Sequence, residues 1–65
     1  MNDEAKERIV RRFTNRFIES GLDIRDDAHA LKKRAEALGD THLMDACGRI
    51  EMLGREICRV AREIR

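Results

Sequence analysis

The sequence predicts an all-α protein, an antiparallel helical hairpin that dimerises into a four-helix bundle. Three observations predict this fold. The 65-residue chain contains no proline, two aromatic residues and 42% charged residues, a composition that favours helix over strand. Large apolar residues recur at seven-residue intervals, accompanied by a row of small residues. A Gly-Asp pair at positions 39 and 40 interrupts this pattern once, and so divides the chain into two helices.

The first predicted helix, residues 3–38, carries one continuous stripe. Its large members, each seven residues apart, are Val10, Phe17, Ile24, Leu31 and Leu38. Four residues beyond the first four of these lie the small residues Thr14, Gly21, Ala28 and Ala35. In heptad notation the large residues occupy position d and the small residues occupy position a. A row of small residues at a allows two helix backbones to approach closely.

The second predicted helix, residues 41–65, repeats the arrangement after a short loop. Its large residues are Leu43, Ile50, Ile57 and Ile64, and its small residues are Cys47, Gly54 and Ala61. In the loop, Gly39 suits the left-handed position that ends a helix, and Asp40 or Thr41 suits the N-cap of the next one. A connection this short joins antiparallel neighbours.

The Ser20-Gly21 pair offers an alternative place to end a helix, with Asp23 as the start of another. The chain would then be a monomeric three-helix bundle with helices near 3–19, 23–38 and 41–65. The heptad phase continues unchanged from Phe17 through Gly21 to Ile24, which favours one continuous helix. That helix would extend past the end of the second by roughly 15 Å, and Val10 and Phe13 would lie on the extension.

The second helix is apolar over a wider arc than one neighbour covers. Besides its stripe it carries Met44, Ala46, Leu53, Cys58 and Val60. A seam between two helices uses only positions a and d, so this helix requires at least two neighbours. A two-fold homodimer of hairpins supplies them. The expected core of the dimer consists of Val10, Ile24, Leu31, Leu38, Leu43, Cys47, Ile50, Gly54, Ile57, Ala61 and Ile64.

Length and charge narrow the classes of function. Residues 1–65 form one domain at most, and 14 basic against 13 acidic residues give no overall attraction to polyanions. No apolar run is long enough for a membrane span, and no signal peptide is apparent, so we expect a cytoplasmic protein. Cys47 and Cys58 lie about 16 Å apart along one helix, too far for a disulfide, and we expect both to be reduced. No cluster of catalytic or metal-ligating residues is present, so we expect neither enzymatic activity nor a cofactor nor a small-molecule substrate.

Two surfaces are candidates for binding. The residues expected to contact a protein partner are Phe13, Arg16, Phe17 and Ser20 in the first helix and Met44 and Leu53 in the second. The residues expected to contact nucleic acid, in the alternative interpretation, are Arg8, Arg11, Arg12 and Arg16, which alternate with phenylalanines. The acidic group Asp23, Asp26 and Asp27 is interpreted as a solvated helix face or as a helix start.

The hairpin resembles the Rop-like proteins, RNA-binding four-helix bundles whose two-helix chains dimerise. The resemblance rests on chain length, on the "LGD" turn at Leu38 to Asp40, on the alternating small and large layers, and on "DAC" at Asp45 to Cys47. It implies the dimeric hairpin fold. The RNA-contacting residues of that family do not map onto this chain residue by residue, so the resemblance does not assign a site.

The sequence therefore predicts a small non-enzymatic protein that regulates or inhibits a protein partner by binding it as a helical dimer. The first alternative is a Rop-like RNA-binding bundle, and the second is a structural oligomerisation module.

Overall fold

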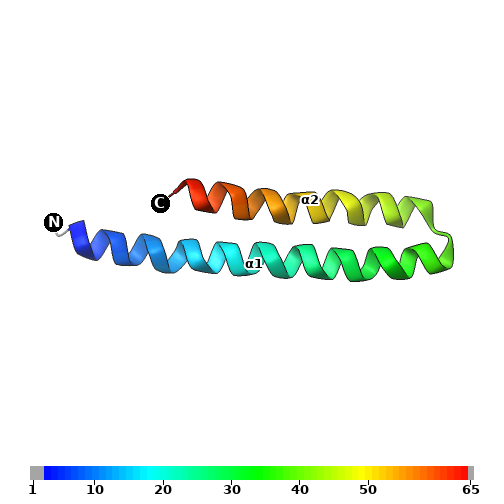
Figure 1. The fold of residues 1–65 in the computed structure, drawn as a ribbon, viewed down its shortest axis with the longest axis horizontal. Coiled ribbons are helices and arrows are strands. Elements are labelled where there is room, and N and C mark those ends of the chain that lie inside the picture. The colour runs from blue at the N-terminus through cyan, green and yellow to red at the C-terminus, as the bar shows by residue number, and fades with distance from the viewer. Residues whose placement is uncertain (1–2, 65) are drawn as a thin grey trace.

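A computed structural model describes residues 3–64 and shows two antiparallel helices lying side by side (Figure 1). Helix α1 spans Asp3–Leu38 and helix α2 spans Thr41–Glu63. Helix α1 passes through Ser20 and Gly21 without a break, which confirms the continuous helix, and the three-helix alternative is wrong. The second helix is shorter than the expected range 41–65, because α2 ends at Glu63 with Ile64 as its C-cap. Arg65 lies outside the described residues.

Close packing explains why α1 carries a glycine at its middle. A Cβ atom at Gly21 would lie 2.8 Å from both the Gly54 carbonyl oxygen and the Cys58 Sγ. A Cβ atom at Gly54 would lie 2.7 Å from the Gly21 carbonyl oxygen. Glycine in a helix costs about 1 kcal/mol relative to alanine. Here that cost is offset because the two backbones touch at Gly21 and Gly54.

The loop is built by local hydrogen bonds that end one helix and begin the next. Gly39 has φ +70°, and its N–H donates to the Glu36 carbonyl at 3.1 Å. The Asp40 N–H donates to the Ala35 carbonyl at 3.0 Å, which completes the usual helix-ending motif. The Asp40 carboxylate then accepts a hydrogen bond from the Leu43 N–H at 3.0 Å and so caps α2.

The small residues are buried between the helices, and the large residues are not. The buried positions are Thr14, Gly21, Ala28 and Ala35 in α1 and Cys47, Gly54, Cys58 and Ala61 in α2. Because the small residues bring the backbones together, the neighbouring large side chains have no room in the seam and project to one side of the hairpin. The single chain therefore has a thin seam rather than a core filled by leucine and isoleucine.

The molecule is a rod in which the N-terminal end of α1 has no part of α2 beside it (Figure 1). Its extents are 56 × 14 × 11 Å, and its radius of gyration is 15.9 Å, against about 10.7 Å for a compact domain of this length. Helix α1 has 36 residues and α2 has 23, so α1 is longer by about 20 Å. Its N-terminal part extends beyond the end of α2 (Figure 1).

The packing at Gly54 can be tested with two alanine substitutions in the same helix. Gly54→Ala forces the backbones apart, and overpacking of this kind costs about 1–3 kcal/mol. Gly48→Ala is the control, because a Cβ there meets nothing within 4 Å, and its higher helix propensity stabilises by up to about 1 kcal/mol. Urea unfolding at one fixed protein concentration should show a lower free energy of unfolding for Gly54→Ala and a higher one for Gly48→Ala. Equal changes in the free energy of unfolding for the two variants would show that the backbone contact at Gly21 and Gly54 does not constrain the fold.

Candidate interaction surface

One side of the hairpin presents a continuous set of large apolar side chains, here called the apolar face. Its members are Phe13, Phe17, Ile24 and Leu31 from α1 and Ile50, Leu53, Ile57, Val60 and Ile64 from α2. Each is between 38% and 59% exposed. These residues occupy heptad positions d and g, and the g positions of two antiparallel helices lie on the same side of their seam. The apolar face is therefore shared by both helices along the length of α2.

The structure divides the expected dimer core into two groups. Cys47, Gly54 and Ala61 are buried within the chain, and Val10 and Leu43 are half-buried. The remaining members are exposed, namely Ile24, Leu31, Leu38, Ile50, Ile57 and Ile64. The single hairpin does not bury these six side chains.

The residues expected to bind a protein partner are only partly brought together. Phe13, Phe17 and Leu53 belong to the apolar face, although they come from different helices. The Arg16 guanidinium lies over the Phe13 ring, with its central carbon 5.5 Å from the ring centroid. Ser20 is exposed on the same helix. Met44 is half-buried, and its heptad position e places it on the opposite side of the hairpin.

The opposite side of the hairpin is closed by polar contacts between the helices. Glu51 of α2 lies with Oε1 3.0 Å from His29 Nδ1 and Oε2 3.8 Å from Lys32 Nζ, and its side chain is only 14% exposed. Deeper in the seam, the Cys58 thiol donates to the Ile18 carbonyl oxygen at 3.5 Å. The two sides of the hairpin therefore differ, since one is completed by polar groups within the chain and the other is apolar and open.

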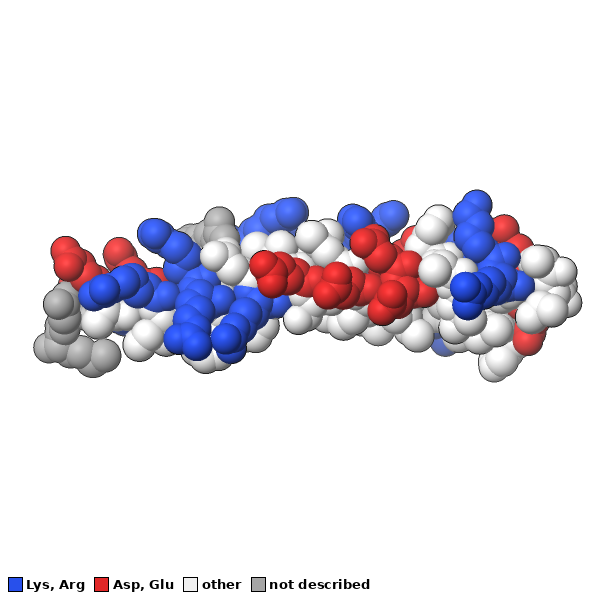
Figure 2. Space-filling model, turned by 90° about the horizontal axis from the view of Figure 1, so that it is seen from below, with Lys and Arg blue, Asp and Glu red and all other residues white. Residues whose placement is uncertain are grey.

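Charges on the outer side of α1 are grouped by sign along the helix. The basic block consists of Arg8, Arg11, Arg12 and Arg16, and the acidic block consists of Glu19, Asp23, Asp26 and Asp27. Figure 2 shows the basic side chains over the N-terminal part of α1, the acidic ones over its middle, and further basic ones near the loop. The sequence interpretation considered the arginines as alternative nucleic-acid contacts and, separately, the acidic group as a solvated helix face. Their adjacency on one side of one helix is what the structure adds.

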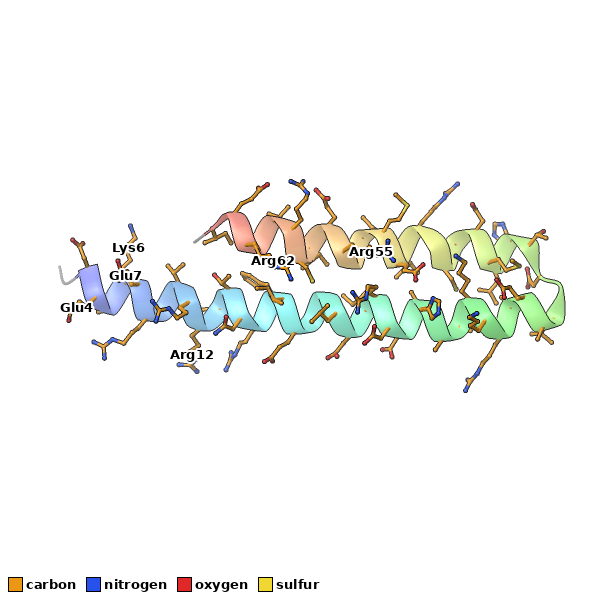
Figure 3. The ribbon with its side chains drawn as sticks, in the orientation of Figure 1. Glu4, Lys6, Glu7, Arg12, Arg55 and Arg62 are labelled. Carbon is orange, nitrogen blue, oxygen red and sulfur yellow. The ribbon has the colours of Figure 1, made fainter. Side chains whose placement is uncertain are left out.

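A hollow of about 720 Å³ lies at the open end of the hairpin. It is lined by Asp3, Lys6, Glu7, Val10, Arg11 and Ile64. Figure 3 shows Lys6 and Glu7 pointing to the side on which α2 lies, whereas Arg12 points away from it. Glu7 occupies the heptad position a that carries small residues further along α1. No part of α2 lies opposite it. The hollow lies where α2 ends and α1 continues.

Within residues 3–64, no group of three or more histidine, cysteine, aspartate or glutamate side chains could hold a metal ion. Cys47 and Cys58 are buried free cysteines. Neither α1 nor α2, as described, has a stretch apolar and long enough to cross a bilayer. Comparison of the chain with protein-family models, with curated proteins and with solved structures finds no match.

An ion-paired group on the outer side of α2 gives a measurable titration. The Arg59 guanidinium hydrogen-bonds to Glu56 and also lies 2.6 Å from Glu63 Oε1. The hydrogen bond from Arg59 lowers the pKa of the Glu56 carboxyl below its ordinary value. We expect Arg59→Gln to raise the pKa of Glu56, as followed by carboxyl carbon NMR shifts during an acid titration. Arg49→Gln is the control, because Arg49 pairs with Asp45 and not with Glu56. It should leave the pKa of Glu56 unchanged. An unchanged Glu56 titration in Arg59→Gln would contradict the pairing.

Proposed function

We propose that this chain is a small non-enzymatic regulatory protein that forms a helical homodimer and acts by binding a protein partner. The observation that carries the proposal is the apolar face, whose side chains remain between 38% and 59% exposed in the single hairpin. An apolar surface of this extent on a small chain is characteristic of an interface. The first occupant we propose is a second copy of the same chain.

The accessible surface supports a second copy as this occupant. The chain exposes 5323 Å², whereas a compact monomer of 7.6 kDa exposes about 4300 Å². The excess of about 1000 Å² is close to the roughly 800 Å² that each partner buries in a stable interface. Two copies related by a two-fold axis would cover each other's apolar face and give each α2 its second neighbour.

The remaining surface supports binding rather than chemistry. The outer sides of both helices carry exposed charges, such as the Arg59 group and the Arg49–Asp45 pair. In the proposed dimer these sides stay in water, and a regulated protein partner would contact them. Arg16 and Ser20 lie at the border between the outer side of α1 and the apolar face, so we place the partner contact there.

Two adjacent residues of α2 test the homodimer. Leu53 belongs to the apolar face and is 59% exposed, whereas Met52 is 69% exposed and lies about 100° further round the helix, on its outer side. Leu53→Glu places a charge in the interface and should raise the dimer dissociation constant by at least about tenfold. Met52→Glu should not change it. Light scattering behind size exclusion should give about twice 7.6 kDa for the unmodified chain under reducing conditions. A monomer at micromolar concentration would contradict the proposal.

RNA binding by a Rop-like dimer is a second candidate, and the basic block favours it. Arg11 and Arg12 are exposed, and within residues 3–64 neither forms an ion pair. With four phosphate contacts to a single strand, affinity should fall roughly 50-fold between 50 and 200 mM salt. Arg11→Glu with Arg12→Glu should abolish binding, whereas Lys33→Glu with Arg34→Glu should weaken it little. Affinity that does not change with salt excludes this candidate.

A further inference from the structure

We propose that two copies of the chain pair with their α1 helices antiparallel about Phe17, so that residues 3–16 of each copy lie on the apolar face of the other. This inference rests on the proposed homodimer and adds its register and the segment that fills each face. Each end of the dimer would then be a three-helix bundle, made of α1 and α2 of one copy and the N-terminal part of α1 of the other. The two α1 helices would run through the whole assembly.

The first observation is apolar surface on the part of α1 that has no helix beside it. Ile9 is 56% exposed, Phe13 is 45% exposed and Val10 is half-buried, although all three lie at or beyond the end of α2. They occupy heptad positions c, g and d, an arc of about 100° on one side of the helix. An arc of this width is what a helix presents when it lies in a groove between two others.

The apolar face of the other copy would receive this segment. Gly21 of α1 is level with Gly54 and Ile57 of α2, which fixes the register of the hairpin. With Phe17 on the two-fold axis, Val10 of one copy faces Ile24 of the other. It therefore also lies level with Leu53 and Ile57 of that copy, whose side chains are 59% and 38% exposed. Phe17 meets its own symmetry mate, a contact that aromatic rings favour.

The second observation is the order of charges along α1. With Phe17 on the axis, Lys6 lies level with Ala28, next to Asp27, and Arg12 lies level with Leu22, next to Asp23. Arg16 lies level with Ile18, next to Glu19. Basic and acidic blocks therefore lie at matching levels twice along the dimer, and Figure 2 shows them as adjacent groups on one side of the helix. Complementary charges of this kind select one register over others.

A dimer centred on the overlap of α1 and α2, near residue 27, fits these observations less well. It would place Asp27 opposite its own symmetry mate, and like charges in direct opposition are destabilising. It would also carry Ile9, Val10 and Phe13 past the loop of the other copy, so that nothing covers them. A parallel dimer would place the two basic blocks side by side. The register about Phe17 instead leaves Leu38, at the end of α1, without cover, and it places Leu31 level with Asp3 of the other copy.

Spin labels on the outer side of α1 distinguish these registers. In a Cys47→Ala/Cys58→Ala background whose mass is first shown to be that of a dimer, one label is placed at Arg12→Cys and, in a second protein, at Lys33→Cys. Pairing about Phe17 predicts axial separations between symmetry-related labels of about 15 Å at position 12 and about 48 Å at position 33. Pairing near residue 27 predicts the reverse order, and a parallel dimer predicts short distances at both positions. Double electron–electron resonance measures them.

Charge reversal tests the facing blocks independently of the labels. Arg12→Glu/Arg16→Glu alone, and Glu19→Arg/Asp23→Arg alone, should each raise the dimer dissociation constant on the order of tenfold, because like charges then face each other. An equimolar mixture should restore the affinity of the unmodified chain, since each reversed block meets its complement. Lys33→Glu/Arg34→Glu is the matched control outside the blocks and should change nothing.

Each result decides between the proposals. A short distance at position 12, a long distance at position 33 and rescue in the mixture support pairing about Phe17. Dimers with any other pattern of distances, or without rescue, overturn this register and leave the homodimer intact. A monomeric unmodified chain overturns both the register and the proposed function.

Discussion

The close approach of two helix backbones at Gly21 and Gly54 is the constraint on which the rest of the structure depends. Carbonyl oxygens of each helix occupy the space where a Cβ of the other would stand. At so short a separation, the seam admits only small side chains, which explains the rows of alanine, glycine, threonine and cysteine. The hairpin is therefore held by many backbone-level van der Waals contacts and by the polar contacts of Glu51, and not by a filled core.

The same constraint determines the shape of the exposed surface. Large residues cannot enter so narrow a seam, so they line one side of it in both helices. The other side is closed by Glu51 with His29 and Lys32. This asymmetry gives the hairpin one apolar and one polar side, although its composition is strongly charged overall. A chain with this asymmetry gains stability by burying the apolar side against another helix surface, and that gain drives the assembly we propose.

Because the two helices differ in length, the two ends of the apolar face differ from each other. A hairpin with equal helices could pair with a second copy in several registers at similar free energy, because repeating layers are interchangeable. Here α1 extends beyond α2 and carries apolar residues there, and its charges change sign between the extension and the middle. Both features distinguish registers that the heptad pattern alone leaves equivalent. Specificity of assembly would therefore come from the extension and from surface charge, while the repeated layers provide the affinity.

The sequence alone determined the two helices, their boundary at Gly39 and the residues of the seam, because these depend on local propensity and on periodicity. It also favoured the continuous α1, since a heptad phase that persists through Ser20-Gly21 is a local observation. Periodicity identified Ile24, Leu31, Ile50 and Ile57 as inward-facing residues, but it could not tell whether they face the other helix of the same chain. Only the tertiary structure decided that, because the answer depends on how closely the backbones approach at Gly21 and Gly54. The tertiary structure likewise joined Phe13 and Phe17 of α1 to Leu53 and Val60 of α2 in one surface. No pattern within either helix fixes that side-by-side placement, since it follows from the register that the packed seam imposes.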